Sequence, residues 1–436
     1  MRGIVDRLGY LKDLGVNAIY LNPIFSSAAN HRYHTYDYFQ VDPLLGGNEA
    51  LRELLDEAHA AGMKVILDGV FNHASRGFWP FHHILENGAN SPYLDWFHVQ
   101  GFPLRPYSSD TNNPANYAGW WGHAALPKIN TDNPGARQYI FDVAKYWIDF
   151  GADGWRLDVP AEIDDDAFWR EFRRIVKTAN ADAYILGEIW HEARRWLQGD
   201  QFDAVMNYYF GKSCVSFFAR ETLSHDFKHP DYALKQIDAL EFASQIDDFL
   251  GLYDWQIILA QMNMLDSHDT PRALHLMGES KTAVRLSVLM QMTMPGAPCI
   301  YYGSEIGMTG AGDPYCRAAF PWERQESWDS DLLAFYKRVI ELRRTHEVLR
   351  TGDYRCLTAE GTGLVFRRRI NGSEAIIGIN AGDTEAVCPV SSENLQERAY
   401  YRVWPRNNGE VVDLTGDQLS VIIPAREAVV LVNQRG

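Results

Sequence analysis

Short apolar segments alternate with amphipathic stretches along residues 1–350 of the chain. Apolar positions at helical spacing predict a first helix that ends at Gly15, and an apolar strand follows directly. The next amphipathic stretch is expected to begin at Asn48, whose side chain can cap a helix, and to end at Gly62. Because apolar strands that alternate with helices are typical of a parallel sheet covered by helices, the pattern predicts an α/β fold.

The helix–strand unit recurs farther along the chain. Helices are predicted over 136–150 and near 166–178, and the predicted strands are "VNAIYLNP", "KVILDGV", "DGWRLDV", "AYILGEIW", "FDAVMNY", "MNMLDSH" and "PCIYYGSEIGM". No Gly-rich phosphate-binding fingerprint follows any of these strands, which argues against an open doubly wound sheet. We therefore expect a (β/α)8-type TIM barrel over 1–73 and 129–350.

Two regions break this pattern. Residues 74–128 lose helical periodicity and are rich in aromatic side chains, which indicates a small inserted domain after the third barrel strand. Residues 351–436 change to short alternating strands, and the Asn371-Gly372 pair is a strong signal for a hairpin turn. We expect this C-terminal region to form an all-β sandwich domain.

Composition narrows the range of partners. The net charge of -16 over 436 residues argues against nucleic acid or an anionic membrane as the main partner. The longest apolar run, Leu286 to Tyr302, is interrupted by prolines and is interpreted as a buried helix, a turn and a strand. The five scattered cysteines are expected to be reduced thiols, and the N-terminal stretch has no signal-peptide core, so a cytoplasmic location is expected.

Polar side chains follow the apolar part of several predicted strands. In "GWRLDVP", strand periodicity places Arg156 and Asp158 on the same face. Since polar residues at the C-terminal ends of barrel strands line the active site, these side chains are expected at one end of the barrel. The candidate set is Asp68, Asn72, His73, Arg156, Asp158, Glu188, His268 and Asp269.

The three acids Asp158, Glu188 and Asp269 suit glycoside hydrolysis, which needs one carboxylate to attack the anomeric carbon and one carboxylic acid to protonate the leaving oxygen. Arg156 is expected to lower the pKa of Asp158 and keep it ionised as a nucleophile. The apolar neighbours of Glu188 are expected to raise its pKa, as an acid catalyst requires.

These residues also admit other interpretations. An isolated buried Arg–Asp pair is usually structural, and a single histidine such as His268 is more often a core residue than a catalytic one. The joint pattern favours function, because four separate strands contribute. A metal site is a second functional hypothesis, but no HExxH pattern is present and Arg156 would repel a cation.

At these residues the sequence resembles the α-amylase family of glycoside hydrolases (family 13), whose four short motifs match "DGVFNH", "GWRLDVP", "GEIW" and "SHDT" in order. More narrowly, it resembles the neopullulanase, cyclomaltodextrinase and maltogenic amylase branch. The segments that carry this closer resemblance are "LNPIFSSAANHRYHTYDYFQVDPLLGG", "LPKIN" around Lys128, "GDQFDAVMNY" and "PCIYYGSEIGMTGAGDPYCR".

The resemblance implies Asp158 as nucleophile, Glu188 as general acid/base and Asp269 as a third carboxylate that stabilises the transition state. It implies double displacement with retained α configuration, on cyclodextrins, pullulan and short maltodextrins, often with transglycosylation. No cofactor is implied as required, whereas calcium and a homodimer both occur among such relatives. The expected substrate-binding residues are His31, Tyr33, Asp68, His73, Arg156, His268 and Arg272.

Two departures from the branch are visible. His34 stands where the branch usually has Asp. By the resemblance, Met1 falls after the first barrel strand, so that strand, the calcium loop and the N-terminal β domain are expected to be missing, as in a fragment. Two alternatives stay open: a general α-amylase or α-glucosidase acting on linear oligosaccharides, and a non-catalytic relative, which the three intact acids argue against.

Overall fold

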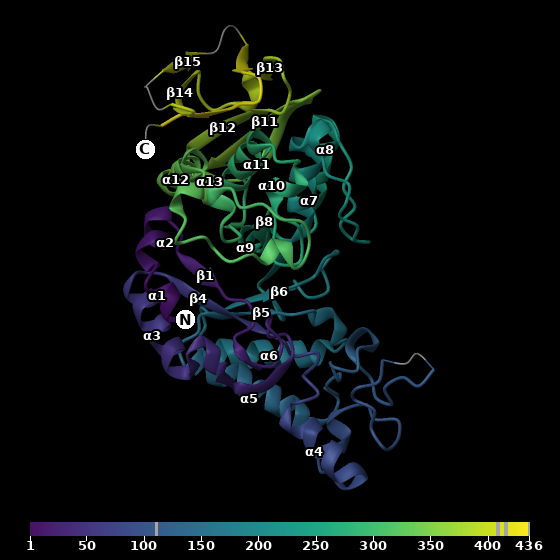
Figure 1. Ribbon diagram of the computed structural model, residues 1–436. Coiled ribbons are helices and arrows are strands. Elements are labelled where there is room, and N and C mark those ends of the chain that lie inside the picture. Colours follow the sequence, from purple (N-terminus) through teal and green to yellow (C-terminus); the bar gives the residue numbers. More distant parts are fainter. Residues whose placement is uncertain (110–111, 407–409, 414–416, 435–436) are drawn as a thin grey trace. The chain divides into compact units, whose positions relative to one another are not determined.

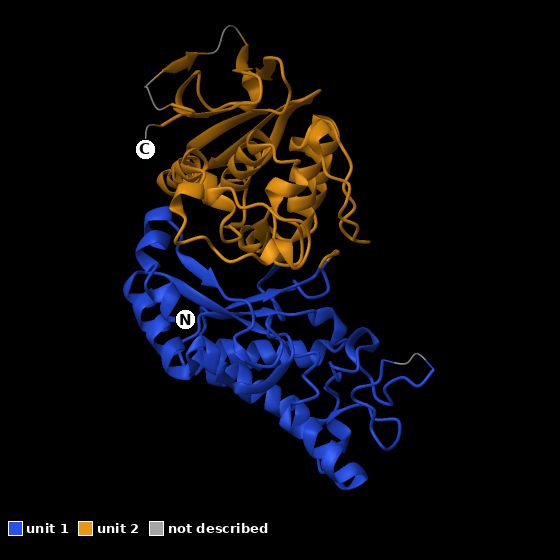
Figure 2. Ribbon diagram, viewed as in Figure 1, with its two compact units in different colours: residues 1–189, 193–205 blue, residues 190–192, 206–436 orange. Residues whose placement is uncertain are grey.

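The structure is a computed structural model that describes residues 1–109, 112–406, 410–413 and 417–434. It divides into two compact units, residues 1–189 with 193–205 (unit 1) and residues 190–192 with 206–436 (unit 2) (Figure 2). Among the described residues, no helix combines the length and apolar character that crossing a membrane would need.

Parallel strands form the centre of unit 1 (Figure 1). They are paired in the order β1 (Ala18–Tyr20), β4 (Lys64–Gly69), β5 (Gly154–Leu157), β6 (Tyr184–Gly187) and β7 (Ala204–Asn207). The helices α1 (Arg2–Val5) and α2 (Leu8–Leu14) precede β1, and the connections between the strands contain α3 (Gly47–Ala60), α5 (Pro134–Asp149) and α6 (Asp166–Ala179). A short antiparallel pair, β2 (Phe25–Ser27) and β3 (Thr35–Val41), follows β1.

The helix ends mostly follow the local sequence signals. Helix α2 ends at Gly15 in the left-handed conformation (φ 95°), as predicted. Helix α3 corrects one prediction: it begins at Gly47, and Asn48 is not its cap. The Asn48 side chain instead accepts a hydrogen bond from the Val41 N–H (2.8 Å) and donates to the Phe39 carbonyl (3.0 Å), so it ties the helix to β3. An amide side chain can bond any nearby backbone, and sequence spacing alone does not show which backbone lies within reach.

In its described residues, 74–109 and 112–128, the aromatic-rich segment after β4 contains the α-helix α4 (Trp79–Asn87) and the 3-10 helices η2 (Gly88–Asn90), η3 (Leu94–Trp96) and η4 (Trp120–Gly122). Its two ends meet, because His73 and Lys128 form an antiparallel bridge. The segment therefore leaves the strand end and returns to it, as expected of an insertion.

In unit 2 the parallel order continues. The last two residues of β7 pair with β8 (Met262–Met264), and β8 pairs with β9 (Ala297–Cys299), which completes a sheet of seven parallel strands. These are the seven strands that the alternating pattern predicts. The α-helices of this unit are α7 (Tyr208–Phe218), α8 (Ala239–Leu250), α9 (Trp255–Ala260), α10 (Ala273–Leu276), α11 (Lys281–Thr293), α12 (Ser330–Thr345) and α13 (Glu347–Thr351).

The part of the C-terminal region that the structure describes is antiparallel and forms one sheet of six strands and one of two. Asn371 and Gly372 connect β11 to β12 with positive φ values of 48° and 82°, which confirms the predicted hairpin turn. The domain boundaries predicted for the barrel, the insertion and the sandwich stay predictions. The strands are β10 (Arg355–Glu360), β11 (Gly363–Ile370), β12 (Ser373–Asn380), β13 (Ala386–Ser391), β14 (Ala399–Trp404), β15 (Val411–Asp413), β16 (Gln418–Ile423) and β17 (Ala428–Val432).

Gly154 opens β5, the strand that carries Arg156, and lies directly opposite Tyr184 of β6. A Cβ atom at Gly154 would collide with the Tyr184 carbonyl oxygen and lie 2.9 Å from its nitrogen. We predict that Gly154→Ala lowers the free energy of unfolding by about 1–3 kcal/mol, because the backbone pairing has to shift. Thermal unfolding measures this effect. Gly9→Ala is the control, since a Cβ there meets nothing within 4 Å, and an equal loss in both variants would contradict the prediction.

Candidate active site

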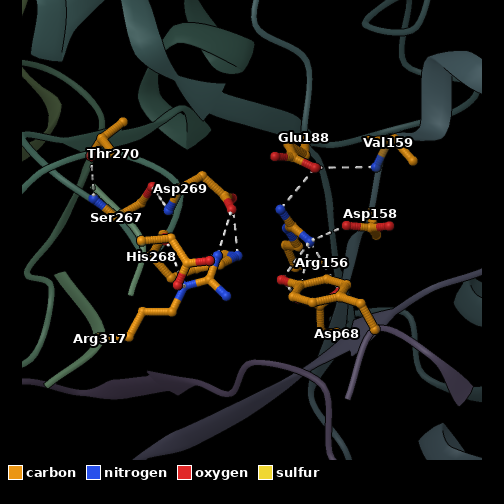
Figure 3. Close-up of polar contacts among 12 residues, drawn as sticks. Asp68, Arg156, Asp158, Val159, Glu188, Ser267, His268, Asp269, Thr270 and Arg317 are labelled. Atoms are coloured by element: carbon orange, nitrogen blue, oxygen red, sulfur yellow. Dashed lines mark hydrogen bonds and ion pairs between the residues drawn. The ribbon is translucent and has the colours of Figure 1, made fainter. Parts of the chain in front are cut away.

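Arg156 is the centre of a cluster of acids in unit 1 (Figure 3). Its Nη1 lies 3.0 Å from Oδ2 of Asp68 and 3.1 Å from Oδ1 of Asp158, and its Nη2 lies 2.9 Å from Oε2 of Glu188. The strand register accounts for this, because Asp68 of β4 is paired with Arg156 of β5, and Glu188 directly follows β6, the next strand. The structure thus brings together the two residues predicted as nucleophile and general acid.

The guanidinium of Arg156 is fully buried. Burial by itself lowers the pKa of Arg156, but the carboxylates of Asp68 and Glu188 outweigh it and raise the net pKa well above its usual value. The cation is therefore permanent. Its contact with Asp158 favours the ionised carboxylate, as the sequence suggested for a nucleophile, although the pKa of Asp158 itself stays a prediction.

Glu188 has polar contacts that its apolar sequence neighbours did not indicate. Besides the ion pair with Arg156, its Oε2 accepts a hydrogen bond from the backbone N–H of Val159 at 3.2 Å. Both contacts favour the ionised carboxylate, whereas the buried surroundings, with 6% of Glu188 exposed, favour the neutral acid. The raised pKa expected from sequence stays a prediction.

Val159 adopts a backbone conformation that is rare for a β-branched residue. Its φ of 36° and ψ of 50° lie in the left-handed region, which disfavours side chains with two substituents on Cβ. This turn directly follows Asp158 and directs the Val159 N–H toward Glu188. Strained backbone of this kind is kept where the surrounding structure holds it, often at functional sites.

Two tyrosines hold Asp68 in place. The hydroxyls of Tyr20 and Tyr33 donate to Oδ2 of Asp68 at 3.1 and 3.2 Å. Since Asp68 and Arg156 are both 0% exposed, they position Asp158 and Glu188 in this conformation, and their assignment as substrate-binding residues stays a prediction. Sequence analysis did not predict a role for Tyr20. The one indication in the sequence was its hydroxyl group at the end of an apolar strand.

Ring side chains lie beside this cluster in unit 1. The His31 ring lies 5.7 Å from that of Tyr33 and 5.1 Å from that of His34, and His73 stacks on Trp120 with ring centroids 5.0 Å apart. Burial lowers the pKa of His73 to about 3 and that of His34 to about 4, so both imidazoles are neutral at pH 7. A neutral imidazole can both accept and donate a hydrogen bond, which suits sugar hydroxyls.

In unit 2, the loop after β8 carries His268 and Asp269. The loop is closed by hydrogen bonds from the Ser267 N–H to Oγ1 of Thr270 (3.0 Å) and from the Asp269 N–H to Oγ of Ser267 (3.1 Å) (Figure 3). Oδ2 of Asp269 lies 3.0 Å from Nε2 of His268, and its Oδ1 lies 3.4 Å from Nη2 of Arg317. Sequence analysis did not single out Arg317, although it lies in the "GDPYCR" segment that carried part of the resemblance.

Arg272, predicted to bind substrate, is fully buried. Its Nη1 donates to the Tyr302 carbonyl at 2.8 Å, and its guanidinium lies over the rings of Tyr301 and Tyr302 at 4.6 and 4.8 Å. These contacts give it a structural role in fixing the chain after β9, and the binding role stays a prediction.

The side chains of the site also bear on metal binding. Within the described ranges, no group of three or more His, Cys, Asp and Glu residues is arranged to hold a metal ion. In unit 1 the candidate acids surround the Arg156 guanidinium, a cation supplied by the chain itself. The five cysteines are free thiols.

Parallel α/β strands with carboxyl groups and an arginine at their C-terminal ends are typical of barrel glycoside hydrolases. The chain belongs to the alpha-amylase family, since the family profile described as "Alpha amylase, catalytic domain" matches residues 1–327. This confirms the predicted family and, with the seven parallel strands, the barrel fold class.

Similar proteins support the narrower branch. The chain is 44% identical over 393 residues to a cyclomaltodextrinase of Geobacillus thermopakistaniensis, covering 89% of this chain and 63% of that protein. It is 45% identical over 361 residues to neopullulanase 2 of Thermoactinomyces vulgaris, covering 83% of this chain and 58% of that protein. The crystal structure of a debranching enzyme from Nostoc punctiforme, 46% identical, superposes with a TM-score of 0.91 over 98% of this chain and 88% of that one. The chain therefore spans less than two thirds of the length of the first two relatives.

The Arg156 cluster generates a stability prediction. Replacing Arg156 with Met removes the cation and leaves buried carboxylates facing one another, so we expect the free energy of unfolding to fall by about 3–5 kcal/mol. Denaturant unfolding at pH 7 measures the loss. The control is Arg170→Met, because Arg170 is 54% exposed in its pair with Asp200 and should unfold near the wild-type midpoint. A wild-type midpoint for the Arg156 variant would contradict the central role of this cation.

The buried imidazole of His73 generates a pH prediction. In the unfolded chain it titrates near pH 6.5, whereas the folded protein lowers its pKa to about 3. Between these values only the unfolded chain takes up the proton, so stability falls as the pH is lowered from about 6.5 toward 3. His73→Gln should remove this contribution, and its melting temperature should fall less than that of the wild type between pH 7 and pH 5.

The matched control for this experiment is His82→Gln, because the His82 side chain is 60% exposed. Its melting temperature should follow the wild-type pH profile. Parallel profiles for wild type and His73→Gln would show that His73 is not buried in its neutral form.

Proposed function

We propose that this protein is a retaining α-glucan hydrolase that cleaves α-1,4-glucosidic bonds in cyclodextrins, pullulan and maltodextrins, with transglycosylation as a second outcome. The observation that carries the proposal is the convergence of Asp158 and Glu188 on the Arg156 guanidinium. Family membership supports the reaction type, and relatives named cyclomaltodextrinase and neopullulanase support the substrate class.

The proposed reaction has two steps. The Asp158 carboxylate attacks the anomeric carbon, and the departing glycosidic oxygen takes a proton from Glu188, which leaves a covalent glycosyl-enzyme. Glu188 then removes a proton from water, and the resulting hydroxide displaces Asp158 with a second inversion. Replacing water with a sugar hydroxyl gives transglycosylation. Two inversions retain the α configuration.

The contact of Asp158 with Arg156 supports its role as nucleophile, and family membership supports the role of Glu188 as acid. The Arg156 contact at 3.1 Å keeps Asp158 ionised, as a nucleophile needs. Glu188 contacts Arg156 and the Val159 N–H through its Oε2, and the proposal assigns it the role of acid. The proposal further includes Asp269 as the third carboxylate. His31, His73 and His268 would bind sugar hydroxyls, and Tyr33 would stack on the sugar ring.

The reaction as proposed uses protein groups alone and requires no cofactor; calcium has no step in it. We also propose a cytoplasmic location, in line with the free thiols and with a relative named intracellular maltogenic amylase. A homodimer is the proposed assembly. The second candidate function, an α-amylase or α-glucosidase acting on linear oligosaccharides, shares the same acids and differs only in substrate.

Substitution of the two acids tests the role assignment. Asp158→Asn and Glu188→Gln should each lower kcat on maltotriose by about three to five orders of magnitude, because each removes a group that acts in bond cleavage. On an aryl α-glycoside with a good leaving group, Glu188→Gln should regain much of its first-step rate, whereas Asp158→Asn should not. Steady-state and burst kinetics measure both effects.

Glu162→Gln is the matched control for these variants, since Glu162 forms a partly exposed ion pair with Lys128 and should keep wild-type kcat. Near-normal turnover by Asp158→Asn would remove Asp158 from the role of nucleophile. An equal loss for Glu188→Gln on both substrates would remove Glu188 from the role of acid.

Product analysis tests the stereochemistry and the substrate class together. β-Cyclodextrin, pullulan and starch are digested side by side, and the anomeric protons are followed by NMR from the first minutes. We expect the α-anomer to form first and β-cyclodextrin to be cleaved faster than starch. Initial release of the β-anomer would exclude double displacement, and a preference for linear chains would favour the second candidate function.

A further inference from the structure

The carbonyl oxygen of His268 accepts two donors from one short segment of unit 2. Nε of Arg317 donates to it at 2.9 Å, and the thiol of Cys316 donates to it at 3.5 Å. Both donors belong to η8 (Tyr315–Arg317), which lies in the "GDPYCR" segment. Two neighbouring side chains therefore fix the same backbone atom of the loop that carries Asp269.

Arg317 also reaches the acid itself. Its Nη2 lies 3.4 Å from Oδ1 of Asp269, and its Nε lies 3.3 Å from Oδ1 of Asp313. The Arg317 side chain is 27% exposed and the Asp269 side chain 28% exposed, so this pair is accessible from solvent. The Arg317 guanidinium thus contacts both the backbone of the loop, at the His268 carbonyl, and the Asp269 carboxylate.

Cys316 differs from Arg317 because it cannot touch a substrate. It is 0% exposed, and its thiol donates to the His268 carbonyl. Burial raises the pKa of the Cys316 thiol, so the group is protonated at neutral pH and remains a donor. Any effect of this side chain on turnover therefore has to pass through the loop.

We propose that Cys316 and Arg317 are positioning residues that hold the loop of His268 and Asp269 in the conformation required for catalysis. The proposal rests on the hydrolase function proposed above, in which Asp269 is the third carboxylate. A displacement of about 1 Å in a catalytic group lowers the rate up to about a hundredfold. Two hydrogen bonds that fix the backbone next to Asp269 therefore affect kcat.

The test compares Cys316→Ala, which removes the donor, with Cys316→Ser, which keeps a hydroxyl donor at nearly the same place. Cys214→Ala is the matched control, because Cys214 is an equally buried thiol of the same unit, in α7. The first measurement is hydrogen exchange of the amides over 266–270 in the substrate-free protein. We expect exchange to rise about three- to tenfold in Cys316→Ala, as the loss of one hydrogen bond implies, and to stay at the wild-type level in the other two variants.

The second measurement is the split between kcat and KM on a maltodextrin. We expect Cys316→Ala to lower kcat about three- to tenfold with little change in KM, and Cys316→Ser to restore most of the loss. Arg317→Lys should show a similar loss of kcat, and combining it with Cys316→Ala should cost less than the two separate losses together, since both act on one carbonyl.

The two measurements separate this inference from the proposed function. Unchanged exchange over 266–270 in Cys316→Ala would overturn the positioning role, whatever the activity. Raised exchange with wild-type kcat would show that the loop is held but that its position does not govern turnover, which also overturns the inference. A wild-type protein that hydrolyses no α-glucan would instead overturn the proposed function, while the exchange data would still decide whether Cys316 holds the loop.

Discussion

The buried guanidinium of Arg156 fixes the arrangement of the acidic side chains at the candidate site of unit 1. Arg156 has no exposed surface, and Asp68, Asp158 and Glu188 all lie within about 3 Å of it, a spacing that uncompensated carboxylates would not tolerate in the interior. The strands β4, β5 and β6 deliver these side chains through their register. The ion pairs of the cluster therefore depend on the strand register, because a register shift of one residue would turn an acidic side chain away from Arg156.

The need to hold these acids around Arg156 explains several local features that would by themselves destabilise the fold. The left-handed conformation of Val159 places a backbone donor beside Glu188, and the hydroxyls of Tyr20 and Tyr33 satisfy Asp68, which is out of reach of solvent. Buried polar groups need such partners, because an unsatisfied carboxylate in the interior is strongly destabilising.

The acid of unit 2 is held in another way. Asp269 lies on a loop, where backbone hydrogen bonds of a sheet cannot fix it, and short-range bonds among Ser267, Asp269 and Thr270 close that loop. The 3-10 helix that carries Cys316 and Arg317 adds two donors to its backbone. The family resemblance of the "GDPYCR" segment thus coincides with a structural task that its sequence alone did not disclose.

The sequence by itself determined the parallel strands, most helix ends, the Asn371-Gly372 hairpin and the identity of the candidate acids, because periodicity, caps and short motifs act over a few neighbouring residues. It also placed Arg156 and Asp158 on one face. Only the tertiary structure decided that Asn48 bonds β3 rather than caps a helix, that Glu188 shares the Arg156 cation, that Tyr20 supports Asp68, and that Cys316 holds the His268 carbonyl. Each of these contacts joins residues that are far apart along the chain or are brought into reach by packing, and the local pattern around either partner does not specify the other.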